Sequence, residues 1–220
     1  MGHVVLVHGA WHGAWCWDAV LDELGHQGVT ATAVELPFTG FADDVAEVRS
    51  AIGLEGSGVV VCAHSYGGVV ASEAVMGLAN VSHLVYISAL VITAEPTLIF
   101  DSTVPLMGAI ISEGPQISFN PSYAHDIFYG DSSEEAAAAA ASRLRPMVMH
   151  PEAFMATERD QPDIPSTYVV CTKDRAISPD GQFAMANASQ TVIEWPTDHS
   201  PFLTRPGDVA DLLASVTSQA

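Results

Sequence analysis

The sequence predicts an α/β fold, with a mostly parallel sheet of six strands that is covered by helices on both faces. Short apolar runs rich in β-branched residues recur along the 220-residue chain, and helical patterns separate them. These runs are apolar at nearly every position instead of alternating with polar residues. A strand of that kind is buried on both faces, which is typical of a parallel sheet between two layers of helices.

The predicted strands share a short length and a high content of valine, isoleucine and threonine, which favour extended backbone. They cover residues 3–7, 29–34, 58–62, 81–88, 167–171 and 191–194. Because parallel strands end at the same edge of a sheet, residues just after their carboxyl ends are expected to lie close together, and function collects at that edge.

The helices between the strands are predicted from apolar residues spaced three and four apart. In residues 15–25, the side chains of Trp17, Val20, Leu21 and Leu24 fall on one face. Further helices are expected over residues 44–52, 66–77 and 208–217.

Residues 92–163 interrupt this alternation, because they are far longer than an ordinary connection between two strands. Within them, residues 133–145 predict a helix with a serine cap at its start and with Arg143 and Arg145 near its end. We therefore expect a core made of residues 1–91 and 164–220, and a helical cap made of residues 92–163 that lies over the strand ends. The alternative is that this insertion only extends the core.

The charge of the chain excludes several partners. Seven Lys and Arg residues against 26 Asp and Glu residues give a net charge of −19, so nucleic acid and anionic membrane surfaces are not expected partners of this acidic protein. The three cysteines have no metal-binding spacing, and their odd number argues against a disulfide framework. Without a signal-peptide pattern at the N-terminus, these features favour a cytoplasmic location.

The clearest local signal is VVVCAHSYGG over residues 59–68, where a buried strand leads directly into a serine and then into a helix. This is the context of a nucleophile elbow. Gly67 and Gly68 are small enough for so tight a turn, and Ala63 adds only a methyl group where glycine is commonest. The turn is expected to raise the hydroxyl of Ser65 above the sheet and to direct the backbone amide of Tyr66 toward it.

A serine hydroxyl needs a base, and the base needs an acid. Among nine histidines, His199 lies in the loop between the last predicted strand and the last helix, at the same edge of the sheet as Ser65. Asp174 follows the fifth predicted strand by three residues and is the favoured acid. Asp198 is an alternative, although its side chain is adjacent to His199 along the chain. Asp180 is another, although it stands at a predicted helix start, where aspartate has a capping role.

The first predicted strand leads into HGAWHGAW over residues 8–15. Its His-Gly turn can direct the amide of Ala10 opposite that of Tyr66, and two amides aimed at one point form an oxyanion hole. His8 and His12 could suggest a pair of metal ligands. The segment is interrupted by glycines and has no evident third ligand, so no metal is expected.

Together, the motifs HGAWHGAWCW, AHSYGG, CTKDRAISP and TDHSPFL resemble the α/β-hydrolase superfamily. More narrowly, they resemble small esterases related to plant methylesterases and hydroxynitrile lyases, and their bacterial relatives. The resemblance extends from His8 to Pro206 and is weakest in residues 92–163. It implies an enzyme without a cofactor, with a helical cap over a largely apolar pocket.

The implied activity is hydrolysis of a small carboxylic ester through an acyl-enzyme on Ser65. The lyase branch requires a threonine and a lysine at positions where this chain has Gly9 and Ser200, and the dehalogenase branch requires an aspartate nucleophile in place of Ser65. Two other functions stay open: a ligand-binding protein without turnover on the same fold, and lactone opening, C–C cleavage or a lyase reaction by the same triad.

The expected substrate is small, neutral and largely apolar. The cap sequence is rich in methionine, phenylalanine and leucine, and the chain has few cationic residues that could hold an anion. The expected pocket lining combines residues near the motifs with apolar residues of the cap. It comprises Trp11, His64, Leu106, Met107, Phe128 and Ser200.

Overall fold

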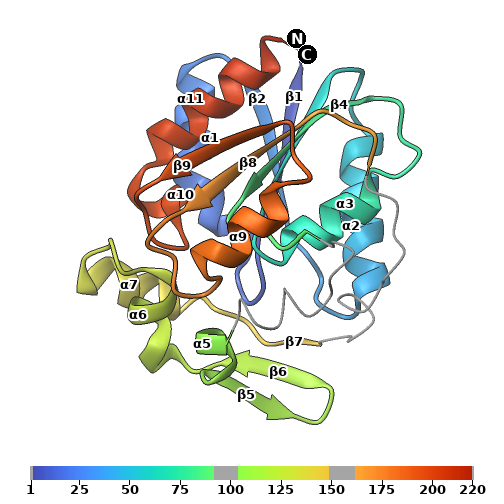
Figure 1. The fold of residues 1–220 in the computed structure, drawn as a ribbon. Helices are drawn as coiled ribbons and strands as arrows, with labels where there is room; N and C mark the ends of the chain where they lie inside the picture. The colour runs from blue at the N-terminus through green and yellow to red at the C-terminus, as the bar shows by residue number, and fades with distance from the viewer. Residues whose placement is uncertain (1, 92–103, 149–161, 220) are drawn as a thin grey trace.

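The computed structural model describes residues 2–91, 104–148 and 162–219, and its centre is a six-stranded sheet (Figure 1). The strand order is β2-β1-β3-β4-β8-β9, and each neighbouring pair is parallel, which confirms the predicted parallel sheet of six strands. The strands are β1 (His3–Val7), β2 (Thr30–Val34), β3 (Val59–His64), β4 (Val81–Ile87), β8 (Ser166–Cys171) and β9 (Thr191–Trp195). From β1 the chain runs to β2 on one side and then to β3 on the other, so the crevice at the carboxyl ends of β1 and β3 is a topological switch point.

Helices cover both faces of the sheet, as predicted (Figure 1). One face packs against η1 (Ala14–Trp17), α1 (Asp18–His26), α10 (Pro201–Thr204) and α11 (Pro206–Thr217). The other face packs against α2 (Phe41–Gly53), α3 (Gly67–Ala74) and α9 (Pro179–Ala186). Successive side chains of a strand point to opposite faces, so Val4 and Leu6 of β1 belong to one core and Val5 and Val7 belong to the other.

Helix α2 begins at Phe41, three residues before the predicted start at residue 44. The carboxylate of Asp44 is buried, accepts a hydrogen bond from the amide of Phe38 at 2.8 Å, and accepts another from the hydroxyl of Tyr66 at 2.7 Å. The position of this helix is therefore fixed in part by a contact with Tyr66, 22 residues further along the chain, which periodicity alone does not reveal.

Residues 104–148 contain more than the expected helices. They form α5 (Val104–Met107), η2 (Pro121–Tyr123), α6 (Ala124–Phe128) and α7 (Glu134–Ala141). They also form a small antiparallel sheet of β5 (Ile110–Glu113), β6 (Gln116–Phe119) and β7 (Met147–Val148). Gly114, with φ of 65°, makes the turn between β5 and β6.

Helix α7 begins at the expected serine cap, because the hydroxyl of Ser133 accepts a hydrogen bond from the amide of Ala136. It ends before Arg143 and Arg145, which therefore do not lie in its last turn. Instead, the guanidinium of Arg143 stacks over the ring of Trp15. Arg145 stacks over Phe38 and donates hydrogen bonds to backbone carbonyls of the core.

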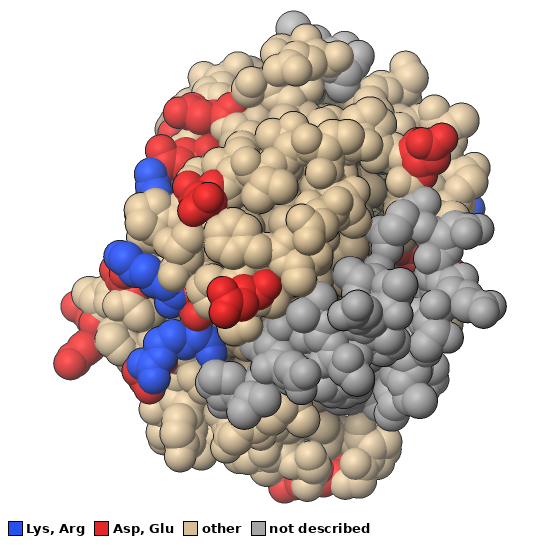
Figure 2. Space-filling model, in the orientation of Figure 1, with Lys and Arg blue, Asp and Glu red and all other residues tan. Residues whose placement is uncertain are grey.

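Among the described residues, four ion pairs join residues 104–148 to the rest of the protein. They are Arg143–Asp18, Arg145–Glu35, Lys173–Asp131 and Arg175–Asp126. Figure 2 shows blue Lys and Arg atoms gathered with red acidic atoms along one flank of the molecule. The chain has only seven Lys and Arg residues, and most of those that the structure describes are therefore paired with carboxylates at this surface.

Two further expectations concern the membrane and the thiols. In the part of the chain that the structure describes, each helix is too short or too polar to cross a lipid bilayer. All three cysteines are free thiols and are buried.

Candidate active site

Ser65 lies in the turn between β3 and α3 and has a φ of 52°, a strained left-handed conformation for a residue other than glycine. Its carbonyl accepts a hydrogen bond from the amide of Leu90 at 2.9 Å. The small residues expected in this turn are required by close packing: a Cβ on Gly67 would lie 2.6 Å from the carbonyl oxygen of His8, and one on Gly68 would lie 2.5 Å from that of Leu90. A strand, a tight turn with positive φ and a helix are the backbone features that a nucleophile elbow requires.

His199 and Asp174 form a buried pair at the same edge of the sheet. The Nδ1 atom of His199 lies 2.7 Å from the Oδ2 atom of Asp174. The amide of Thr172 donates to the carbonyl of Trp195, and the amide of Lys173 donates to that of Thr197, so the loops after β8 and β9 run side by side. The proximity of the two loops accounts for the pair.

Of the three carboxylates considered as acids, only Asp174 contacts the ring of His199 among the described residues. Asp198 turns toward residues 104–148, and its Oδ2 atom accepts a hydrogen bond from the amide of Asp131 at 2.9 Å. Asp180 lies in the first turn of α9. Burial raises the pKa of the Asp198 carboxyl above its ordinary value.

Ser65 and His199 are not hydrogen-bonded to each other within the described structure. His64, which directly precedes Ser65, contacts His199. The Nε2 atom of His64 donates to the carbonyl oxygen of His199 at 2.9 Å, and the two ring centroids are 4.5 Å apart. Burial lowers the pKa of His64 well below its ordinary value, so this ring is neutral. A hydrogen bond between a catalytic serine and its base often forms only when substrate is bound, so its absence here is compatible with a pairing of Ser65 and His199.

The loop after β1 passes directly against Ser65. A Cβ on Gly9 would lie 2.8 Å from the Cβ of Ser65 and 2.9 Å from Nδ1 of His64. His8 sets the orientation of this loop: its Nε2 accepts from the amide of Leu36, and its Nδ1 donates to the carbonyl of Gly9. In a trans peptide the N–H points opposite to the C=O, so the amide of Ala10 points away from the ring of His8.

His12 fixes the next peptide unit of that loop. Its Nδ1 donates to the carbonyl of Ala10, and its Nε2 accepts from the hydroxyl of Tyr129, both at 2.9 Å. Burial lowers the pKa of His8 to about 3 and that of His12 to about 4, so both rings are neutral. Both nitrogens of each ring are already in use, and no cluster of three metal-ligating side chains occurs among the described residues.

Four of the residues expected to line the pocket lie in this region. Trp11 and Phe128 pack together with Phe119, and the Phe128 ring lies 5.5 Å from that of His199. His64 and Ser200 are buried beside His199.

The two predicted lining residues from α5 differ in burial. Leu106 packs against the core cluster that includes Trp11 and Phe128, whereas Met107 is 51% exposed. Their role in a pocket stays a prediction.

Two side chains that contact the Asp174 carboxylate were not predicted from the sequence. The hydroxyl of Ser88 and the side-chain amide of Gln182 both donate to its Oδ2 atom. Ser88 could have been found, because it is a polar residue at the carboxyl end of an apolar strand. Gln182 has no comparable signal in the sequence.

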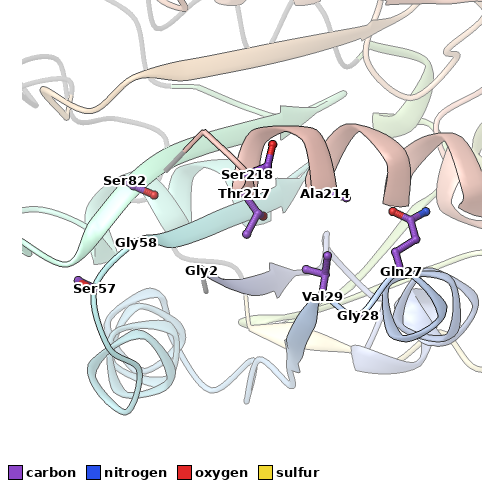
Figure 3. Close-up of a pocket in the computed structure, with 10 residues that line it drawn as sticks. All are labelled: Gly2, Gln27, Gly28, Val29, Ser57, Gly58, Ser82, Ala214, Thr217 and Ser218. Atoms are coloured by element: carbon purple, nitrogen blue, oxygen red, sulfur yellow. The ribbon is translucent and has the colours of Figure 1, made fainter.

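A pocket of about 650 Å³ lies at the opposite edge of the sheet, near the amino ends of the strands (Figure 3). Its lining includes Gly2, Gly58, Ser82 and Thr217 and contains no charged side chain. Its lining contains no histidine that could act as a base, and it includes none of Ser65, Asp174 and His199. This pocket is therefore separate from the candidate site.

Comparisons of the sequence with known proteins cover nearly the whole chain. A sequence model described as the alpha/beta hydrolase family matches residues 4–212. Methylesterase 18 of Arabidopsis thaliana is 29% identical, with 98% of this chain and 97% of the relative covered. Esterase PIR7B of Oryza sativa subsp. japonica is 23% identical, with 99% and 96% covered.

Solved structures show the same architecture. Tomato Methylketone Synthase I matches with a TM-score of 0.87 and 20% identity, covering 99% of this chain and 98% of that one. Polyneuridine aldehyde esterase matches with a TM-score of 0.84 and 19% identity, covering 99% of each chain. At these identities the likeness concerns the fold.

Proposed function

Since this chain belongs to the alpha/beta hydrolase family, we propose that it is a serine hydrolase that cleaves carboxylic esters, with Ser65, His199 and Asp174 as its catalytic residues. The observation that supports this most strongly is the buried hydrogen bond between His199 and Asp174, at the sheet edge where Ser65 occupies a strained turn. Relatives named methylesterase and esterase, which match over nearly the whole chain, support the same reaction class.

The proposed reaction has two steps. The Nε2 atom of His199 takes the hydroxyl proton of Ser65 as the oxygen attacks the ester carbonyl, and Asp174 stabilises the imidazolium that forms. The imidazolium then protonates the leaving alcohol as the C–O bond breaks, which leaves an acyl-enzyme on Ser65. Water, deprotonated by His199, then attacks the acyl carbon. The bond to the Ser65 oxygen breaks, that oxygen takes the proton from His199, and the acid leaves.

The amides of Ala10 and Tyr66 are proposed to hold the oxyanion of each tetrahedral intermediate. The hydrogen bond from His8 to the carbonyl of Gly9 orients the peptide unit that contains the Ala10 amide, and the close approach of Gly9 keeps that unit next to Ser65. Preorganised amides of this kind contribute roughly 10²–10³ to the rate.

The proposed substrate is small, neutral and largely apolar, with residues 92–163 acting as a cap over the site. The ring of Phe128 lies 5.5 Å from that of His199, and the rings of Phe119 and Trp11 continue this aromatic cluster. Few cations are available to hold an anion, because four of the seven Lys and Arg residues pair with acidic side chains between the core and residues 104–148.

Hydrolysis of p-nitrophenyl butyrate, compared with hydrolysis of the anionic mono-p-nitrophenyl succinate, tests the substrate class. We expect the neutral ester to have the higher kcat/KM. A clear preference for the anionic ester would remove the proposal of a neutral substrate and leave the reaction class intact.

Two aspartate variants test the assignment of the acid. Asp174→Asn is expected to lower kcat by roughly 10⁴, because the neutral amide neither holds the ring tautomer nor stabilises the imidazolium. Asp198→Asn is expected to lose far less, because Asp198 bonds to residue 131 and not to the ring. The reverse order would transfer the role to Asp198, and tight binding of esters without any turnover would favour a ligand-binding protein.

A further inference from the structure

Ser88 directly follows β4 and has a φ of 44°, in the left-handed region that residues other than glycine rarely adopt. Two hydrogen bonds fix the chain there: the amide of Ser88 donates to the carbonyl of Val169 at 3.0 Å, and the amide of Leu90 donates to that of Ser65 at 2.9 Å. Glycine would adopt this backbone without strain. The strained position is instead occupied by a residue with a hydroxyl group.

That hydroxyl is fully buried and contacts both partners of the His199–Asp174 pair. Its Oγ atom is within close hydrogen-bonding distance of Oδ2 of Asp174 and lies 3.1 Å from Nδ1 of His199. A hydroxyl group has one proton to donate and two lone pairs. Since a carboxylate only accepts, Ser88 donates its proton to Asp174 and presents a lone pair toward the N–H of His199.

Gln182 also contacts the carboxylate but has a different role. Its Nε2 atom donates to Oδ2 of Asp174 at 2.8 Å, and its Oε1 atom accepts from the amide of Cys171 at 2.9 Å. Among the described residues, Gln182 has no contact with His199. Ser88 is therefore the side chain that joins the acid to the base.

We propose that Ser88 is a positioning residue, whose hydroxyl locks the ring of His199 against Asp174 so that Nε2 stays directed toward Ser65. This inference rests on the proposed function. Without the hydroxyl, the N–H of His199 keeps only the carboxylate as a partner, and the ring populates orientations that cannot take the serine proton. Ser88 has no exposed surface with which to touch a substrate. The effect therefore falls on kcat and not on KM.

Two variants separate the hydroxyl from the backbone strain. Both variants remove the hydroxyl. Ser88→Ala keeps the Cβ and therefore the backbone strain, whereas Ser88→Gly removes the Cβ and relieves the strain. Ser166→Ala is the matched control, because Ser166 is a buried serine at the opposite end of the sheet, where its hydroxyl bonds to Gln190. In p-nitrophenyl butyrate hydrolysis we expect kcat to fall roughly tenfold or more in both Ser88 variants, with KM within about twofold, and to stay unchanged in Ser166→Ala.

Proton NMR of the protein without substrate provides a readout that does not depend on turnover. The proton between Nδ1 of His199 and Asp174 is expected at low field, assigned by its loss in His199→Asn. We expect this resonance to move or to broaden by exchange in both Ser88 variants and to be unchanged in Ser166→Ala.

Wild-type kcat in both Ser88 variants, an unchanged resonance, or recovery of kcat in Ser88→Gly alone would overturn the inference. Absence of esterase activity in the wild type would instead refute the proposed function, and the resonance would still decide whether Ser88 positions the ring.

Discussion

Adding one methyl group at Gly9 perturbs the candidate site with very little change in composition. The Cβ of Gly9→Ala would lie 2.8 Å from the Cβ of Ser65 and 2.9 Å from Nδ1 of His64. The first distance is roughly 0.7 Å inside the separation at which carbon atoms attract. Neither neighbour can move freely, because the carbonyl of Ser65 accepts a hydrogen bond from the amide of Leu90 and the ring of His64 donates one to the carbonyl of His199. The loop that contains Ala10 must therefore move away from Ser65.

The size of the effect follows from that displacement. Moving a catalytic group by about 1 Å costs roughly 10² in rate, and loss of one oxyanion donor costs roughly 10²–10³. We therefore expect kcat of Gly9→Ala to fall about a hundredfold. Forcing a methyl group into packed surroundings costs about 1–3 kcal/mol, which lowers Tm by roughly 2–10 °C in a chain of this size.

The assay is p-nitrophenyl butyrate hydrolysis at a temperature well below both unfolding transitions, with Tm measured by circular dichroism. Gly25→Ala is the control, because no atom lies within 4 Å of its added Cβ, and it lies within α1. Its kcat should match the wild type, and its stability should rise by about 0.5–1 kcal/mol from helix propensity. A folded Gly9→Ala with wild-type kcat would refute the argument that this loop forms the oxyanion hole.

Three further predictions concern stability and reactivity. Arg145→Ala removes side-chain hydrogen bonds to two backbone carbonyls of the core and should lower the free energy of unfolding by about 1.5–3 kcal/mol in urea titrations. Arg205→Ala loses an exposed ion pair and should change this free energy by less than about 1 kcal/mol. Equal effects of the two substitutions would contradict the role of Arg145. Burial holds the pKa of His8 at about 3 and that of His12 at about 4, so below pH 6.5 the unfolded chain binds more protons than the folded one. The free energy of unfolding from urea titrations should therefore fall as pH decreases from about 6.5 to 4, by roughly 1.4 kcal/mol per pH unit for each histidine. The slope should be shallower in His12→Gln, and a flat profile would refute this. Burial raises the pKa of all three cysteine thiols, so Ellman's reagent should label them only in denaturant, and fast labelling of the native protein would contradict their burial.

The parallel sheet could be predicted from the sequence because its inner strands β1, β3, β4 and β8 contain short apolar runs. The edge strands β2 and β9 are more polar and more exposed. The same reasoning does not extend to β5 and β6. Ile110 is only partly buried, and the other three residues of β5 are exposed, so burial does not specify this strand. Its pairing depends on the turn at Gly114 and on β6, which packs Ile117 and Phe119 into the core.

In the candidate site, the meeting of Asp174 with His199 follows from one rule, that parallel strands end at the same edge. The contacts that complete the site do not follow from it. The place of Ser88 at a strand's carboxyl end is visible in the sequence, but its contact with both residues is made with a φ of 44°, which no local pattern reveals. The roles of His8 and His12 depend on which backbone groups surround each ring. Their spacing in the sequence raised the question of a metal site, which was rejected for lack of a third ligand. In the structure, their hydrogen bonds orient the peptide units on either side of Ala10.

The most direct test of the central claim is covalent labelling of Ser65 with a fluorophosphonate, followed by intact mass and peptide mapping. The reagent reacts with a serine only when a base activates the hydroxyl. We predict one adduct per chain, on the peptide that contains Ser65, with no adduct in Ser65→Ala and much slower labelling in His199→Ala. An unlabelled wild-type protein, or equal labelling of Ser65→Ala, would contradict the assignment of Ser65 as the nucleophile.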